Sequence, residues 1–129
     1  MKKMNNKGFS LVELIVVIAI MAVLVGVLAP QFIKYVESSR RSTDISNAQN
    51  IQSAMLADIA DGLKSGTNSE TVSAGNPTTL GEAPKGKGSA YKGQDFTASY
   101  DVGKGICNVY LGGQELTSGP VAESYKNNH

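Results

Sequence analysis

The chain has 129 residues, with 12 Lys and Arg against 11 Asp and Glu and a formal net charge of +1. This length suits a single domain, and the nearly balanced charge, without a basic patch in the sequence, argues against a nucleic-acid-binding protein. Cys107 is the single cysteine, so an intramolecular disulfide is excluded. We expect Cys107 to be a small buried residue of a strand; a reactive or intermolecularly bridged thiol is the alternative.

The first eight residues form a basic leader that holds Lys2, Lys3 and Lys7 and no acid. After Glu13, residues 14–33 carry no charge and are strongly apolar. Twenty helical residues span about 30 Å, the thickness of the hydrocarbon core of a bilayer. A soluble helix that is apolar on all sides needs a large protein around it, and the rest of the chain is too short. The run therefore predicts a membrane-spanning helix.

An ordinary secretory signal is the alternative for this segment. Such signals have an apolar region of about 7–15 residues followed by a small-x-small cleavage site. Here the run is longer, and its one acceptable site, residues 27–29, is followed at once by Pro30. We therefore expect the helix to be retained, with the leader in the cytoplasm and the bulk of the chain outside. Lys34, Arg40 and Arg41 on the far side weaken this charge asymmetry.

Glu13 lies at the head of the apolar run, where a carboxylate is costly and usually has a partner or a function. In one interpretation, Glu13 is near enough to the helix end to reach the lipid head groups. In the other it needs a cation, and none follows before Lys34. A new α-amine would serve if the chain were cut just upstream. The joint between Gly8 and Phe9 is the candidate cleavage site, because it follows the leader and opens the apolar run.

The stretch KGFSLVELIVVIAIMAVLVGVLAPQF, residues 7–32, resembles the N-terminus of type IV pilins and pseudopilins. The stretch is similar to the class III signal of the prepilin family, in a form that resembles the type IVa pilins. The shared pattern is Gly8, Phe9, a small hydroxyl residue, two apolar residues, Glu13 and a long apolar run with Pro30 inside it. The similarity covers roughly residues 7–62, and the C-terminal half shares only the general architecture.

The resemblance implies that a membrane-embedded prepilin peptidase cuts after Gly8 and usually methylates the new amine of Phe9. Glu13 is then expected to meet the Phe9 amine of an adjacent subunit and to set the register of otherwise apolar helices. The resemblance further implies a single-pass precursor in the cytoplasmic membrane and an assembly platform with an ATPase. Its product would be a helical homopolymer outside the cell that serves adhesion or twitching motility.

The helix is expected to continue beyond the membrane. Pro30 lacks an N–H and crowds the carbonyl near Gly26, so we expect a kink or local melting there. Residues 36–63 predict an amphipathic continuation, with one apolar face at Ile45, Ala48, Ile51, Met55 and Ile59. Other faces are assigned to polar residues, namely Asp44, Gln49, Asn50, Gln52 and Asp58. Residues 37–42 are polar all round, which favours a bridge to the head or contacts with neighbouring subunits.

The second half of the chain predicts a loop followed by a sheet. Residues 64–93 are rich in Gly, Ser, Thr, Asn, Lys and Pro and indicate an exposed loop. Residues 94–129 indicate a small antiparallel sheet and a C-terminal tail, with strands at 95–101, 106–111 and 121–125 and a turn at 103–105. The expected fold is α+β: a long N-terminal helix, membrane-spanning in its first half, whose second half packs against the sheet.

The sequence shows no catalytic constellation, since the single histidine, His129, is the last residue. The acidic residues that follow the apolar run are scattered and form no cluster of oxygen ligands for calcium. GEAPKGKGS, residues 81–89, lacks the Ser/Thr, strand and helix of a phosphate loop. We therefore expect no enzyme, cofactor or metal. A major pilin is favoured, because the head lacks the calcium-binding acids and Trp of a major type II pseudopilin. A pseudopilin of a type II secretion or competence system, or an anchored surface protein that never polymerises, are the alternatives.

Overall fold

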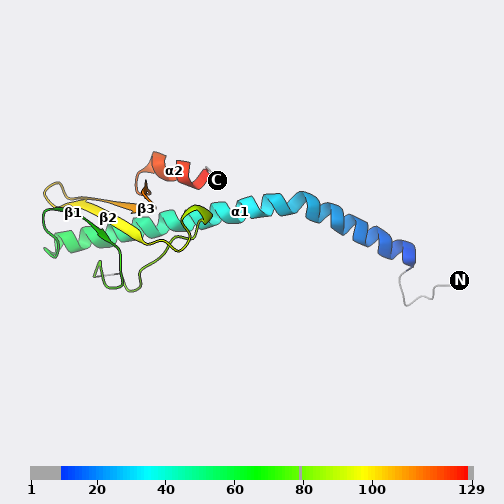
Figure 1. The fold of residues 1–129 in the computed structure, drawn as a ribbon, viewed down its shortest axis with the longest axis horizontal. Coiled ribbons are helices and arrows are strands. Elements are labelled where there is room, and N and C mark those ends of the chain that lie inside the picture. Colours follow the sequence, from blue (N-terminus) through cyan, green and yellow to red (C-terminus); the bar gives the residue numbers. More distant parts are fainter. Residues whose placement is uncertain (1–9, 79, 128–129) are drawn as a thin grey trace. The chain divides into compact units, whose positions relative to one another are not determined.

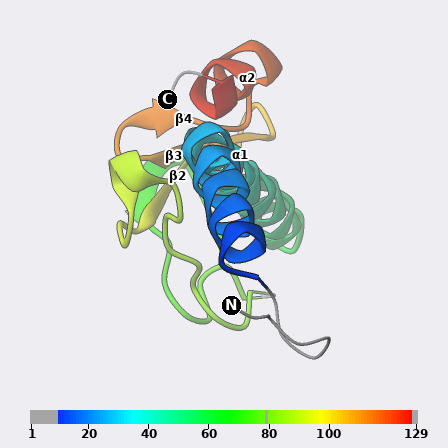
Figure 2. The ribbon, with the colours of Figure 1, turned by 90° about the vertical axis from the view of Figure 1, so that its right-hand side faces the viewer.

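The computed structural model of the chain describes residues 10–78 and 80–127, which form two compact units. We call residues 10–35 the stem and residues 36–127 the head. Helix α1, Leu11–Ala60, contributes to both units (Figure 1). The head adds a four-stranded sheet, a short 3-10 helix η1 at Ser89–Tyr91, and the C-terminal helix α2, Gly119–Asn127, which lies beside the last strand (Figure 2).

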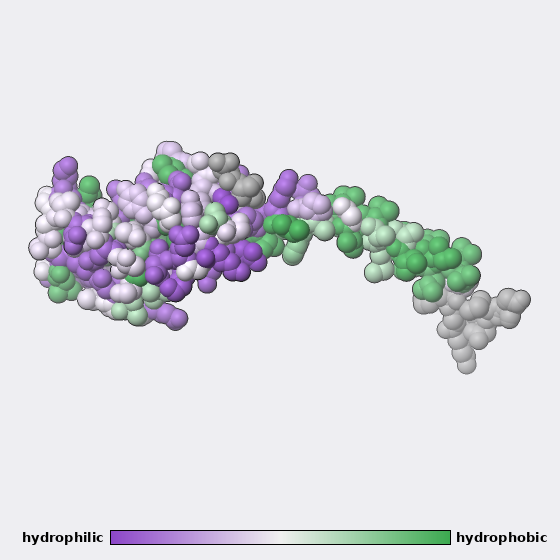
Figure 3. Space-filling view, in the orientation of Figure 1, coloured by the Kyte–Doolittle hydropathy of each residue, from purple (hydrophilic) through white to green (hydrophobic). Residues whose placement is uncertain are grey.

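The stem is helical throughout from Leu11, with Gly26 and Pro30 inside the helix. Its surface is almost uniformly apolar, whereas the head surface mixes hydrophilic and neutral residues (Figure 3). By length and composition, α1 is the one helix among the described residues that is apolar enough to cross a membrane. The apolar helix predicted from the sequence is therefore present.

The sheet is an antiparallel meander in the order β1-β2-β3-β4. Its strands are β1 at Thr67–Thr71, β2 at Phe96–Asp101, β3 at Ile106–Leu111 and β4 at Gln114–Glu115. The turn at residues 102–105 joins β2 to β3 as predicted, with Asp101 opposite Ile106. Gly112 and Gly113 form the two-residue turn before β4, and both have positive φ values of 59° and 82°. Such a turn requires the left-handed conformation at both residues, which favours glycine.

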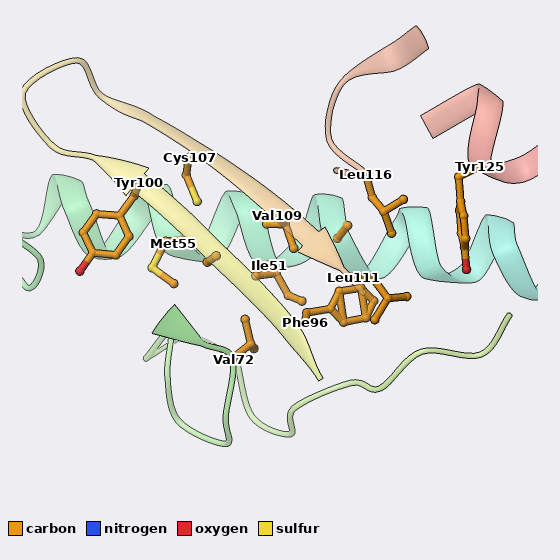
Figure 4. Close-up of a cluster of buried hydrophobic side chains, with 12 residues drawn as sticks. Ile51, Met55, Val72, Phe96, Tyr100, Cys107, Val109, Leu111, Leu116 and Tyr125 are labelled. Carbon is orange, nitrogen blue, oxygen red and sulfur yellow. The ribbon is translucent and has the colours of Figure 1, made fainter. Parts of the chain in front are cut away.

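The core of the head lies between α1 and the sheet (Figure 4). Ala48, Ile51 and Met55 of α1 are fully buried against alternate residues of the strands. The strand residues of this core are Phe96, Ala98, Tyr100, Cys107, Val109 and Leu111. Ile45 and Ile59 pack at the edges of the same cluster. The predicted apolar face of the helix and the α+β class are thus confirmed.

Strand β1 lies inside the segment that the sequence predicts as a loop. All five residues of Thr67–Thr71 are polar and mostly exposed, so the strand carries no alternation that could mark it. It forms because each of its residues pairs with a residue of β2. The prediction of an unstructured segment over 64–93 was wrong at this point.

Residues 121–125 are helical in the structure, not the third strand predicted from the sequence. Pro120 suits the first turn of a helix, because its φ is preset and its missing N–H is not needed there. The N–H of Ala122 donates to the carbonyl oxygen of Ser118 at 2.8 Å. Ala122 and Tyr125 are buried at a spacing of three, which only a helix places on one face.

Candidate functional site

Ser10 caps the N-terminal end of α1. The N–H of Glu13 donates to Oγ of Ser10 at 3.1 Å, and the N–H of Leu14 donates to the carbonyl oxygen of Ser10 at 3.1 Å. Ser10 is therefore the N-cap and Glu13 the third helical residue, the spacing of a capping box. A carboxylate here also faces the positive end of the helix dipole. Glu13 thus has a local role in starting the helix, and it is exposed.

The stem offers an apolar surface for lipid or for another helix. Its large apolar side chains in residues 11–32 are 48–70% exposed. A shallow hollow on this surface is lined by Leu24, Val25, Leu28, Ala29 and Phe32. Contiguous apolar surface of this extent marks a site of contact with a membrane or a protein.

In the head, the buried face of α1 is a single seam with alternating spacings of four and three residues. Its apolar middle is Ala48, Ile51 and Met55. Its ends are charged, with Glu37, Arg41 and Asp44 on one side of that middle and Asp58 on the other. The sequence-based prediction that Asp44 and Asp58 occupy other faces was wrong. Residues 37–42 were expected to form a bridge to the head or to contact neighbouring subunits, and two of them, Glu37 and Arg41, are buried within the head itself. These side chains are buried because each has partners outside the helix.

Asp44 is completely buried and accepts three hydrogen bonds from distant parts of the head. The N–H of Lys87 donates at 2.7 Å, the N–H of Gly88 at 2.9 Å and the hydroxyl of Tyr125 at 2.5 Å. Burial, and then the hydrogen bond and charge of Asp44, raise the pKa of Tyr125, so its hydroxyl remains a donor. Tyr125 extends from α2 toward α1 (Figure 4). A single carboxylate thereby joins α1, α2 and the loop before β2.

Glu37 and Arg41 form a second buried contact at this end of the seam. Arg41 Nε donates to Glu37 Oε2 at 2.7 Å, and Arg41 Nη1 donates to the carbonyl oxygen of Tyr125 at 2.9 Å. The N–H and hydroxyl of Ser89 donate to Glu37 Oε2 at 2.9 and 3.0 Å. Burial opposes ionisation of Glu37, but the hydrogen bonds from Arg41 and Ser89 outweigh it and hold the pKa of Glu37 below its ordinary value.

Asp58 anchors the loop at the other end of the seam. It accepts from the N–H of Thr78 at 2.9 Å and from the hydroxyl of Thr78 at 2.5 Å. The segment between β1 and β2 is therefore fixed to α1 through residues 78, 87, 88 and 89.

Cys107 is 2% exposed in β3, as predicted, and burial followed by the charge of Glu70 raises its pKa to about 11.

The chain resembles one family model and several known proteins over part of its length. The family model described as the prokaryotic N-terminal methylation motif matches residues 3–29. A type IV major fimbrial protein FimA of Dichelobacter nodosus is 28% identical over 79% of this chain and 59% of its own length. A second protein of that name from the same organism is 33% identical over 50% of this chain and 41% of its own length. The chain is therefore similar to type IV fimbrial proteins and carries the N-terminal methylation motif.

The chain spans about three fifths of the length of the first curated relatives that it matches. No solved structure matches it. These relatives are named as fimbrial proteins.

The predicted processing site of the chain, Gly8 and Phe9, lies outside the described residues. Cleavage after Gly8, methylation of Phe9 and its pairing with Glu13 therefore stay predictions. Gly26 and Pro30 lie in continuous helix, so melting at this place also stays a prediction, and it would belong to the assembled filament.

The sequence analysis missed the functions of Ser10 and Asp44. The Ser-x-x-Glu spacing of residues 10–13 was the signal for the cap. The signal for Asp44 was its distance of seven residues from Ile51, which returns it to the apolar face after about two turns. Its partners in residues 87, 88 and 125 carry no signal that links them to the helix.

Proposed function

We propose that the chain is the major subunit of a type IV pilus, cleaved after Gly8 and polymerised through its N-terminal helix. The observation that supports this most directly is the N-terminal methylation motif at the head of an exposed apolar helix. In this proposal residues 1–8 are the removed leader, and residues 9–35 are the membrane anchor of the precursor and later the filament core. Phe9 carries the new, methylated amine.

Glu13 pairs with the amine of Phe9 on a neighbouring subunit in this proposal. Opposite charges 4 Å apart attract by about 4 kcal/mol at an effective dielectric constant near 20, before desolvation is subtracted. A buried charge that loses its partner is strongly destabilising. Among apolar helices that can slide past one another, this pair therefore selects one register.

The exposed apolar side chains of the stem support two successive environments for the subunit, first the membrane and then the filament. In the precursor, lipid surrounds the side chains that the chain leaves exposed, and in the filament the stems of sister subunits replace the lipid. A prepilin peptidase, an assembly platform and a cytoplasmic ATPase are the partners that such a path requires. The filament would serve adhesion or twitching motility at the cell surface.

Variants of residues 10 and 13 separate charge pairing from helix capping. Glu13→Gln keeps a side chain that can complete a capping box but removes the charge, and Glu13→Val removes both. We expect both variants to be cleaved and inserted but to form almost no filaments. Ser10→Ala weakens the cap by about 1 kcal/mol and keeps the charge, so its filaments should form. The measurements are the intact mass of the subunit and electron microscopy of sheared cell-surface material.

Gly8→Val is the control for processing, because it should leave a precursor that is heavier by the leader. Normal filament yield from Glu13→Gln would contradict the charge-pairing role. Cleaved wild-type subunit without abundant long fibres would instead favour a pseudopilin or an anchored protein that never polymerises.

A further inference from the structure

A basic depression lies on the head, where α1 meets the loop before β2. Its volume is about 540 Å³, within the range of small-molecule sites. Four cationic side chains line it, together with two hydroxyl residues of α1: Arg40, Lys85, Lys87, Lys92, Ser39 and Thr43. The cations come from two segments far apart in the sequence, which explains why no basic patch is visible there. We call this surface the basic groove.

Hydrogen bonds fix the backbone that carries the lysine side chains of the basic groove. Asp44 binds the N–H groups of Lys87 and Gly88, so the backbone of this segment is anchored while the Lys87 side chain remains exposed. The N–H of Gly86 donates to the carbonyl oxygen of Gln94, and the N–H of Gly93 donates to that of Gly86, both at 2.9 Å. The side chains of the groove therefore project from a fixed backbone.

Most of the charge in the basic groove is not neutralised by the head itself. Lys85 forms an ion pair with Asp95, and Glu82 lines the adjoining depression with Lys85 and Lys87. Among the described residues, Arg40, Lys87 and Lys92 form no ion pair with a carboxylate. The neighbouring Arg41 is different, because it is buried against Glu37. Three exposed cations therefore converge without a counter-ion from the part of the chain that the structure describes.

A phosphate group suits this arrangement. Arginine offers a planar fork of donors to phosphate, and lysine offers a mobile point charge. The hydroxyl group of Ser39 adds a neutral hydrogen-bonding group at one wall, whereas the Thr43 hydroxyl donates to the carbonyl oxygen of Ser39 at 3.1 Å. Because the backbone N–H groups of Gly86 and Gly93 are already used, recognition would depend on the side chains.

We propose that the basic groove binds the phosphate of an anionic phospholipid head group while the pilin is anchored in the membrane. This inference rests on the proposed membrane stage. Arg40 follows Ile33, the last residue of the uncharged run, by seven residues of the same helix, about two turns. Cations close to a membrane surface are attracted to anionic lipid in the leaflet that they face, which in the proposed topology is the non-cytoplasmic one. A lipid head group is therefore the source of phosphate assigned to the groove.

The test uses the full chain in detergent, with lipid binding measured by native mass spectrometry. Phosphatidylglycerol, phosphatidylcholine and inorganic phosphate are added separately at equal concentration. We expect wild type to bind phosphatidylglycerol at least fivefold more than the other two. Each cation near a lipid surface is worth about a fivefold change in binding, so Lys87→Gln/Lys92→Gln should lose most of this preference. Lys104→Gln/Lys126→Gln removes two lysines outside the groove and should retain it.

Equal loss of preference in both double variants would overturn the proposal, because the effect would then follow net charge. A preference unchanged by Lys87→Gln/Lys92→Gln would overturn it as well. If inorganic phosphate binds the wild type as well as phosphatidylglycerol does, the ligand is a soluble phosphate and the lipid assignment is wrong. Failure of the proposed function is visible separately, as a chain that is not cleaved or inserted in cells.

Discussion

Glu37 is ionised at a buried position because Arg41 and Ser89 donate to its carboxylate. Its folded pKa lies below the ordinary value of 4.5, so the unfolded chain binds a proton more readily. The resulting stability is present above the unfolded pKa and is lost as the pH falls through the lower folded pKa. We therefore predict that the free energy of unfolding of the head declines as the pH is lowered from about 5.

Glu37→Gln should be less stable than wild type at pH 7 and should show a weaker decline in acid. Denaturant unfolding, followed by circular dichroism at a series of pH values, measures both effects. Glu82→Gln is the matched control, since Glu82 is exposed, and it should keep the wild-type pH profile. An acid decline of equal slope in Glu37→Gln and wild type would assign the effect to other carboxylates.

Individual polar residues of α1 show where sequence reasoning reaches its limit. Ile51 and Met55 could be placed in the core because apolar side chains at helical spacing favour burial. Asp44 has the same spacing but was assigned to solvent, because a buried carboxylate is unfavourable without partners. Two of those partners are backbone N–H groups, of Lys87 and Gly88, which almost any sequence would supply, and the third is the hydroxyl of Tyr125. Only the folded structure, in which the loop passes this part of α1, shows that these N–H groups reach Asp44.

The loop between β1 and β2 is an element with a fixed path, and Gly86 tests this directly. A methyl group at Gly86 would lie 2.2 Å from the carbonyl oxygen of Tyr91 and 3.1 Å from Cδ2 of Leu111. Since the first contact is with backbone, Gly86→Ala should destabilise the head by about 1–3 kcal/mol. Gly81→Ala lies in the same segment with nothing within 4 Å, and its stability should be nearly unchanged.

Unfolding midpoints and limited proteolysis of the loop measure this prediction. Gly86→Ala should lower the midpoint and speed cleavage within residues 72–95, and Gly81→Ala should do neither. Equal behaviour of the two variants would mean that the loop shifts freely away from Tyr91, and that its anchors on α1 do not fix its path.

Strands and helices differ in how far their sequences determine them here. β2 and β3 alternate buried side chains with more accessible ones, so both were predicted within one or two residues. β1 has no apolar face and depends on pairing with β2, which its own residues do not encode. The sequence of α2 fits either a strand or a helix, and Pro120 with the 122–125 spacing decides for the helix. The local sequence pattern is therefore sufficient to predict an element only where one face of that element is buried and the other is accessible.

At the scale of the molecule, the stem and the head depend on different surroundings. The stem exposes its apolar side chains, so under the proposed function its stability would come from lipid or from sister helices. The head buries a core of its own between α1 and the sheet. Within the described residues, the buried contacts that hold the head, including those of Glu37, Asp44 and Asp58, all join residues of the head.

A chain that begins at residue 34 should therefore fold as a soluble head without the stem. The truncation removes none of the hydrogen bonds of the buried seam, and it leaves Glu37 in the first turn of the shortened helix, where a carboxylate is favourable. We expect its unfolding midpoint to match that of the head in the full chain in detergent, and sedimentation to give a monomer. It should form no filaments, because the apolar surface and Glu13 are both gone. A truncated chain with native secondary structure but no cooperative unfolding would show that the head needs the stem, or its neighbours, to pack.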